Sequence, residues 1–383
     1  MSPQLRAIAA GAKELADVAP LYLRLSLLDF SVVVRSESRA PLTWLRWFTA
    51  PCFPNDAEKQ GDWQISYRCN PQAFNDFTEL IQQVPCQEIA SLHPDGTLLR
   101  HREYQLPDMR LLYNDGFDAY CCAWPKQRKI MLLAQRDEES ARLYLARATR
   151  KLMVLHYQRG GSAVFHASAY EQDGGATLGI AYKGGGKTTL LVRHLMSGAH
   201  FITNDRALIY LQNDRPMVSG LPNIVTLRPG TLELFPKLKD RLATRRYRQV
   251  KPNADRTQYR ITSAQLCRLT EATSSPGAPV RRILFLSPEA PENRPASREE
   301  ARTILREAIF DYGDRPRVFF SSLYPVDQAQ FRQAADALCE TLIDNCSCEF
   351  QGWWEEKTEG ARDRQRLSSD NRALAPSLSG GGE

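Results

Sequence analysis

The stretch AYKGGGKTT at residues 181–189 constrains this 383-residue chain more than any other part of its sequence. It nearly matches the pattern G-x-x-x-x-G-K-[ST], in which a glycine-rich loop between a strand and a helix holds phosphate groups. The first position is Ala181 instead of glycine, so a strand-to-helix turn with an incidental lysine is the alternative interpretation. The flanking sequence decides between the two, because a phosphate loop needs a strand before it and a helix after it.

The flanks meet this requirement. ATLGIAY (176–182) predicts a strand, and KTTLLVRHLMSG (187–198) predicts a helix that ends at Gly198, a suitable left-handed cap. Before them, SAVFHASAY (162–170) alternates as a strand does, and after them HFITNDRALIYL (200–211) predicts a strand interrupted by polar residues. The order strand, glycine loop, helix, strand is the context in which the pattern predicts phosphate binding.

The glycines and the lysine have complementary roles in such a loop. Gly184, Gly185 and Gly186 allow consecutive backbone N–H groups to point at anionic oxygens, and the helix N-terminus adds its dipole. Lys187 brings a positive charge to the β- and γ-phosphates. Ala181 falls where the loop leaves the strand, a position that needs small size more than a positive φ, so alanine is compatible with the loop.

Three more residues complete the predicted site. Thr188 is predicted to put its hydroxyl on Mg²⁺, and Thr189 is assigned with it to nucleotide binding. Asp205, 18 residues after Lys187, is the expected carboxylate for the same ion, although turn or cap aspartates also occur in such positions. His166 is the third element, for which a purely structural role is the alternative.

Taken together, the segment from Phe165 to Leu208 resembles the catalytic core of the HPr serine kinase/phosphorylase family. That family has a strand histidine 21 residues before the loop lysine, the interval that separates His166 from Lys187 here. It also has an acidic pair 17 and 18 residues after the lysine, where this chain has Asn204 and Asp205. The letters NDR are more similar to the HprK-related B-type branch than to the true HPr kinases.

The resemblance implies a fold, an activity and a set of ligands. It implies an α/β P-loop kinase domain of the PEPCK/HPr-kinase type with a mixed sheet, ATP and Mg²⁺ as ligands, and transfer of a phosphoryl group to a hydroxyl, most commonly a serine of a protein or peptide. His166, Asn204 and Asp205 are the implied catalytic residues, and a homo-oligomer is implied because HPr kinases assemble as hexamers.

The chain also departs from the family. Asn204 stands where the family has the aspartate regarded as the proton acceptor; loss of that base need not abolish transfer, with Asp205 covering both roles or His166 assisting. The later glutamate-bearing motif is not recognisable, and GLPNIVTLRPG occupies its region. The first half does not match the family's N-terminal domain, so HPr itself is not implied as the substrate. A nucleotide-binding regulatory or scaffold protein that has lost catalysis is the alternative function.

Composition shifts divide the chain into four parts. Residues 1–137 predict a smaller, strand-rich α+β domain, and 138–160 predict a linking helix with an apolar stripe. Residues 161–350 predict the P-loop domain. Residues 355–383 predict a disordered tail, because their composition offers little apolar surface to bury; the SLSGGGE at its end is not read as an ABC-type signature.

Charge and cysteine content bound the partners and the location. Residues 236–260 carry nine Lys or Arg against two Asp, a block that can attract nucleic acid, phosphate or an acidic partner, or form a solvated loop. Only two aromatic residues lie within it, which weakens the prediction of a nucleic-acid platform. The nine cysteines form no C-x-x-C pair and are expected to be reduced. The charged N-terminus and the lack of long apolar runs predict a cytoplasmic protein without a membrane span.

Overall fold

The computed structural model describes residues 3–17, 19–56, 58–82, 84–92, 98–114, 117–182, 184–244, 249–250, 258–287, 293–310 and 323–352. The tail predicted at 355–383 and part of the basic segment 236–260 lie outside these residues. Within them, no helix combines the length and the apolar character that crossing a bilayer requires. All nine cysteines are unpaired thiols.

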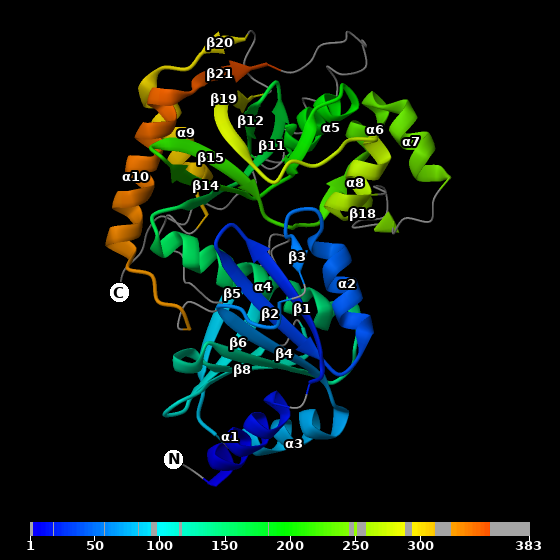
Figure 1. Cartoon of the computed structure of the whole chain (residues 1–383), viewed down its shortest axis with the longest axis vertical. Coiled ribbons are helices and arrows are strands. Elements are labelled where there is room, and N and C mark those ends of the chain that lie inside the picture. Colours follow the sequence, from blue (N-terminus) through cyan, green and yellow to red (C-terminus); the bar gives the residue numbers. More distant parts are fainter. Residues whose placement is uncertain are drawn as a thin grey trace, which may run out of the picture.

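The first half of the chain forms a nine-stranded sheet with the order β3-β1-β2-β4-β9-β8-β7-β6-β5 (Figure 1). Its strands are β1 (Leu21–Leu27), β2 (Phe30–Ser36), β3 (Asn55–Asp56), β4 (Trp63–Cys69), β5 (Gln87–Leu92), β6 (Leu98–Gln105), β7 (Arg110–Asn114), β8 (Ala119–Trp124) and β9 (Lys129–Ala134). β4 pairs parallel with both β2 and β9, whereas the other neighbours pair antiparallel. The strand-rich character predicted for this half is present, together with helices that the sequence had not located.

Helices cover both faces of this sheet. α1 (Pro3–Ala16) and α3 (Pro71–Ile81) contribute to one apolar cluster, and α2 (Arg39–Thr49) and α4 (Glu139–Arg159) contribute to the other. Successive residues of β9 divide between them: Met131 belongs to the cluster of α1 and α3, and Leu132 to that of α4. Side chains of a strand point alternately to its two faces, so β8 and β9 are buried along nearly their whole length.

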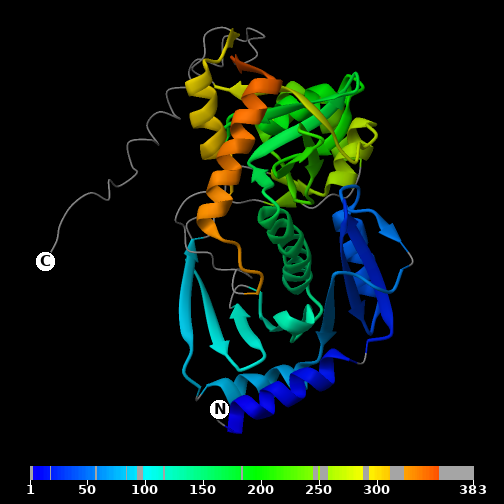
Figure 2. The same cartoon turned by 60° about the vertical axis from the view of Figure 1, so that its left-hand side comes forward.

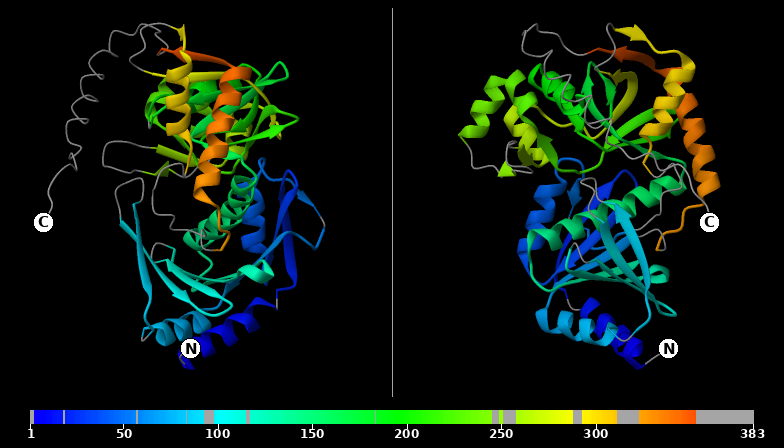
Figure 3. Two further views of the ribbon diagram at one scale, coloured as in Figure 1. Left: turned by 90° about the vertical axis from the view of Figure 1, so that its left-hand side faces the viewer. Right: turned by 180° about the vertical axis from the view of Figure 1, so that it is seen from behind.

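Helix α4 is the predicted linking helix and matches its expected bounds to within one residue. It lies between the two sheets (Figures 2 and 3). The predicted apolar stripe is buried throughout: Ala141, Tyr144, Leu145, Ala148, Leu152 and Leu155. These residues share one cluster with strands of the first sheet and with residues of the second half of the chain, so the packing is continuous from one half to the other.

The second half forms another mixed sheet, with the order β10-β14-β15-β19-β12-β11-β13. In addition, β21 pairs with β19, and β20 pairs with β21. Its strands are β10 (Ala163–Phe165), β11 (Ala167–Gln172), β12 (Gly175–Ile180), β13 (His200–Thr203), β14 (Ala207–Gln212), β15 (Arg215–Gly220), β19 (Ala278–Leu286), β20 (Arg294–Pro295) and β21 (Ser347–Gln351). β19 pairs parallel with β12 and β21, while β11 pairs antiparallel with β12 and β13. The architecture is therefore α/β with mixed sheets, as predicted at that level.

Helices again cover both faces of this sheet. α9 (Arg298–Ala308) and α10 (Gln328–Asn345) pack with Phe165, Ala167 and Ala169, alternate residues of the segment predicted as a strand. α5 (Lys187–Met196) lies on the opposite face, where Leu190 joins the cluster that contains Val164. The sheet thus positions the loop between β12 and α5 at one of its ends.

The segment between β15 and β19 contains elements that the sequence had not predicted. A small antiparallel sheet of β16 (Val225–Leu227), β18 (Gln258–Ile261) and β17 (Gln249–Val250) accompanies α6 (Pro229–Leu234), α7 (Pro236–Ala243) and α8 (Ser263–Thr270). Helix α7 holds the first part of the basic segment and buries Leu238 and Leu242, so that part is a packed helix and not a solvated loop.

Candidate phosphate-binding site

The glycine loop connects the end of β12 at Ile180 to the start of α5 at Lys187. Gly184 and Gly186 have φ values of +90° and +95°, a region that favours glycine. Gly185 is required for a different reason. A Cβ at Gly185 would lie 2.8 Å from the Cβ of Ala181 and 3.2 Å from the carbonyl oxygen of Tyr182. The methyl group of Ala181 therefore fits because residue 185 has no side chain.

Lys187 folds back onto this loop. Its Nζ donates to the carbonyl oxygen of Ala181 at 2.7 Å and to that of Tyr182 at 3.4 Å. Burial lowers the pKa of Lys187 to about 8; the charge of Asp205 opposes this shift and that of Arg228 adds to it. Because burial disfavours the charged ammonium group, an anion that approaches Lys187 stabilises it.

The start of α5 is available to an anion as well. Gly186 is the N-cap of this ten-residue helix, and no described side chain caps it. The first amides of a helix have no intrahelical acceptor, and together with the helix dipole they favour negative charge. The loop conformation, the buried lysine and the uncapped helix therefore fit a phosphate group.

The two threonines of the loop make different contacts. Thr188 Oγ1 donates to Oδ1 of Asn204 at 3.1 Å, and Thr189 Oγ1 lies 3.0 Å from Oγ1 of Thr231 in α6. Asn204 is buried, at 7% exposure. The hydroxyl predicted to reach Mg²⁺ is thus held by the residue beside Asp205, and not by Asp205 itself.

His166 and Asp205 come together from different strands. His166 lies between β10 and β11, where its backbone N–H donates to the carbonyl of Ala308 at 2.7 Å. Asp205 lies between β13 and β14. Nδ1 of His166 is 3.1 Å from Oδ1 of Asp205, at ion-pair distance but without the alignment of a hydrogen bond. Asn223 Nδ2 donates to the other carboxylate oxygen at 3.1 Å.

The environment of His166 favours the neutral form of its ring. Burial lowers its pKa below the usual value; Asp205 opposes the shift, while the charges of Lys187 and Arg206 add to it. The guanidinium of Arg206 lies over the ring of Phe310 at 4.4 Å, and that ring meets the imidazole edge to face at 5.5 Å. A neutral imidazole beside a carboxylate is able to accept a proton.

The described residues also bear on metal binding. They contain no group of three or more His, Cys, Asp or Glu side chains able to hold a metal ion. A site built from the Thr188 hydroxyl and the Asp205 carboxylate fits Mg²⁺, which in phosphate-handling sites keeps several waters and uses one or two protein oxygens plus the phosphates. The two predicted metal residues are not in direct contact with each other here, because Asn204 accepts the threonine hydroxyl.

Sequence reasoning missed several neighbours of this site. Asn223, which holds Asp205, lies in a loop without a recognisable motif. Thr231 lies in a helix that was not predicted. Arg206 directly follows Asp205, so its proximity to the carboxylate was readable from the chain, but its position over Phe310 was not.

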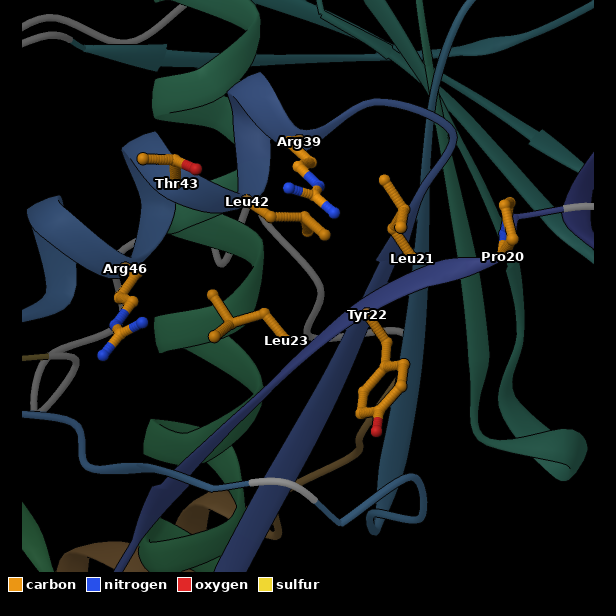
Figure 4. Close-up of a pocket in the computed structure, with 8 residues that line it drawn as sticks. All are labelled: Pro20, Leu21, Tyr22, Leu23, Arg39, Leu42, Thr43 and Arg46. Carbon is orange, nitrogen blue, oxygen red and sulfur yellow. The ribbon is translucent and has the colours of Figure 1, made fainter.

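A separate hollow lies in the first half of the chain. It has a volume of about 290 Å³ and opens between β1 and α2, where Arg39 and Arg46 accompany Leu21, Leu23 and Leu42 (Figure 4). It shares no residue with the glycine loop.

A scan of protein-family models and a search of curated proteins gave no match to this chain.

Proposed function

We propose that this protein is an ATP- and Mg²⁺-dependent kinase that transfers a phosphoryl group to a hydroxyl, a serine of a protein or peptide substrate. The observation that carries the proposal is the 3.1 Å approach of His166 Nδ1 to Asp205 Oδ1. The charge of Lys187 lowers the pKa of His166, and that of Asp205 raises the pKa of Lys187, so the three groups form one site. A phosphate-binding loop alone supports nucleotide binding, whereas a proton acceptor beside it supports transfer. The resemblance to HPr kinase-related proteins points the same way.

Each residue has a defined task in this proposal. The amides of Gly184, Gly185 and Gly186 and the ammonium of Lys187 bind the β- and γ-phosphates, and Thr189 anchors the first turn of α5 to α6. Thr188 and Asp205 are the residues that would hold Mg²⁺. When bound, this ion neutralises charge on the phosphate oxygens.

The proton moves to His166. In the transfer step the acceptor oxygen forms a bond to the γ-phosphorus, and the bond between that phosphorus and the β,γ-bridging oxygen breaks. The hydroxyl proton passes to the neutral imidazole, and the neighbouring carboxylate of Asp205 stabilises the positive charge that forms. This role suits His166 because the amide of Asn204 has no basic site at neutral pH.

The alternative is a nucleotide-binding regulatory or scaffold protein without transfer activity. The buried amide of Asn204 favours it, since a carboxylate is replaced there by a neutral group that is already occupied by Thr188. Phosphoryl transfer depends mainly on positioning and charge stabilisation, so the loss of one carboxylate slows transfer without excluding it.

The test is transfer of label from γ-labelled ATP, with Mg²⁺, to a library of serine-containing peptides. We expect acid-stable phosphoserine with the unmodified protein and with the control Ser197→Ala, at the far end of α5, and loss of label in Lys187→Ala and His166→Asn. Nucleotide binding without label on any peptide would favour the regulatory alternative, and absence of nucleotide binding would refute both. We propose the cytoplasm, where ATP is available, as the location.

A further inference from the structure

Two arginines of α4 extend from the linking helix toward the second half of the chain. Arg150 Nη1 donates to the carbonyl oxygen of Pro222 at 2.6 Å, in the loop that follows β15. One helical turn earlier, the guanidinium of Arg147 lies over the ring of Phe117 at 4.8 Å. Both side chains are partly buried. Each guanidinium therefore keeps donors that these contacts do not use.

The charges of two further arginines, Arg206 and Arg260, act on these two side chains. Burial lowers the pKa of Arg150 well below its usual value, and the charges of Arg206 and Arg147 lower it further. The pKa of Arg147 is likewise lowered by burial and by the charges of Arg206 and Arg260. Within the described part of the chain, no carboxylate lies at ion-pair distance from Arg147 or Arg150. Like charges gathered in a partly buried place favour the approach of an anion.

The cluster borders the proposed reacting groups. Pro222, the partner of Arg150, is followed by Asn223, which holds the carboxylate of Asp205. The same carboxylate acts on Arg150 as a favourable charge, although its oxygens already serve His166 and Asn223. The loop at Pro222 and Asn223 thus connects Arg150 to the carboxylate that lies beside His166.

We propose that Arg147 and Arg150 bind an oxyanion, a phosphate or carboxylate group of the acceptor molecule, so that the kinase selects acceptors with a negative group near the reacting hydroxyl. The oxyanion site stands on the arginine cluster, whereas its use by an acceptor rests on the proposed function. Guanidinium groups suit this role because their planar donors match the oxygens of phosphate and carboxylate. The alternative is that Arg150 serves only to join α4 to the loop at Pro222.

Thermal unfolding with inorganic phosphate as the probe tests the site. The background variant is Lys187→Ala, which removes the lysine from the phosphate contacts of the glycine loop, and NaCl of equal ionic strength is the reference. We expect a saturable rise of the unfolding midpoint with phosphate in Lys187→Ala. The rise should fall by at least half when Arg147→Met is added, and it should persist when Arg282→Met, in the ion pair with Glu349 on β19 and β21, is added instead.

A second variant controls for misfolding. Arg150→Lys keeps the charge and a donor for Pro222 but loses the planar fork, so we expect it to fold and to need roughly tenfold more phosphate for the same rise. Sodium acetate in place of phosphate shows which oxyanion the site prefers. An equal rise with and without Arg147→Met, or no saturable rise in Lys187→Ala with either anion, would overturn the inference.

Peptide phosphorylation separates this inference from the proposed function. For a serine peptide with a neighbouring acidic residue, we expect Arg147→Met to raise KM about tenfold with kcat retained. Phosphate binding that depends on Arg147, without transfer to any peptide, would leave the site standing and remove the kinase. Transfer with an unchanged KM in Arg147→Met would leave the kinase standing and would refute the role of the arginines in acceptor selection.

Discussion

Replacing Gly185 with alanine tests how the glycine loop is packed. The new Cβ would lie 2.8 Å from Cβ of Ala181, closer than such atoms come in proteins, and neither atom can rotate away because both are attached to the backbone. The loop itself must move. Overpacking of this kind costs about 1–3 kcal/mol, and each kcal/mol lowers the unfolding midpoint of a domain of this size by about 2–4 °C. The expected loss is therefore about 2–12 °C.

The companion variant Ala181→Gly makes the test specific. It removes the clashing methyl group and leaves only the 3.2 Å contact with the carbonyl of Tyr182, so it should restore part of the midpoint lost in Gly185→Ala. Scanning calorimetry of the two single variants and the double variant measures this coupling. Gly230→Ala is the matched control, since a Cβ there meets nothing within 4 Å. A double variant that loses the sum of the two single losses would refute the packing argument.

Three further predictions concern the same site and the linking helix. Because its pKa is about 8, Lys187 loses its proton between pH 7 and pH 9, and the affinity for ATP should fall roughly tenfold over this range. Calorimetric titration measures this fall, which should be absent in Lys187→Met. Thr188→Val removes the hydroxyl at constant shape, so Mg²⁺ should no longer strengthen ATP binding in titrations, whereas it should still do so in Thr188→Ser. Equal Mg²⁺ dependence in the two variants would contradict the assignment of Thr188 to the metal. Leu152→Ala creates a cavity in the fully buried stripe of α4 and should lower the free energy of unfolding by about 2–5 kcal/mol in denaturant titrations; a loss below about 1 kcal/mol would show that α4 does not anchor the core.

The local features of the site were predictable from the sequence because each depends on neighbours in the chain. The strand before the glycine loop, the helix that begins at Lys187 and the break at Asn204 all appear where the pattern placed them. Two of the loop glycines adopt the positive φ that the motif requires. The exclusion of a side chain at Gly185 by Ala181 was not visible in the pattern, since it depends on how the loop closes.

The remaining features depend on contacts between distant segments. Asn223 reaches Asp205 only because the loop after β15 returns to the break between β13 and β14. Arg150 is separated from Pro222 by 72 residues, and nothing in the helical stripe of α4 indicates that contact. Helices α1 and α3 were not predicted, and the double-sided burial of the strands is explained only when both helices are in place. An apolar repeat of two or of 3.6 residues identifies a strand or a helix, but it does not show which elements lie next to each other in the fold.

Calorimetric titration of the protein with ATP and Mg²⁺ tests the central claim most directly. If Lys187 and the glycine loop hold nucleotide phosphates, the unmodified protein binds ATP at one site. Lys187→Met weakens that binding at least tenfold, because a hydrogen bond to a charged group contributes about 1.5–3 kcal/mol. Ser197→Ala, at the exposed far end of α5, leaves the affinity unchanged. Equal affinity in all three proteins, or no binding by the unmodified protein, would contradict the account.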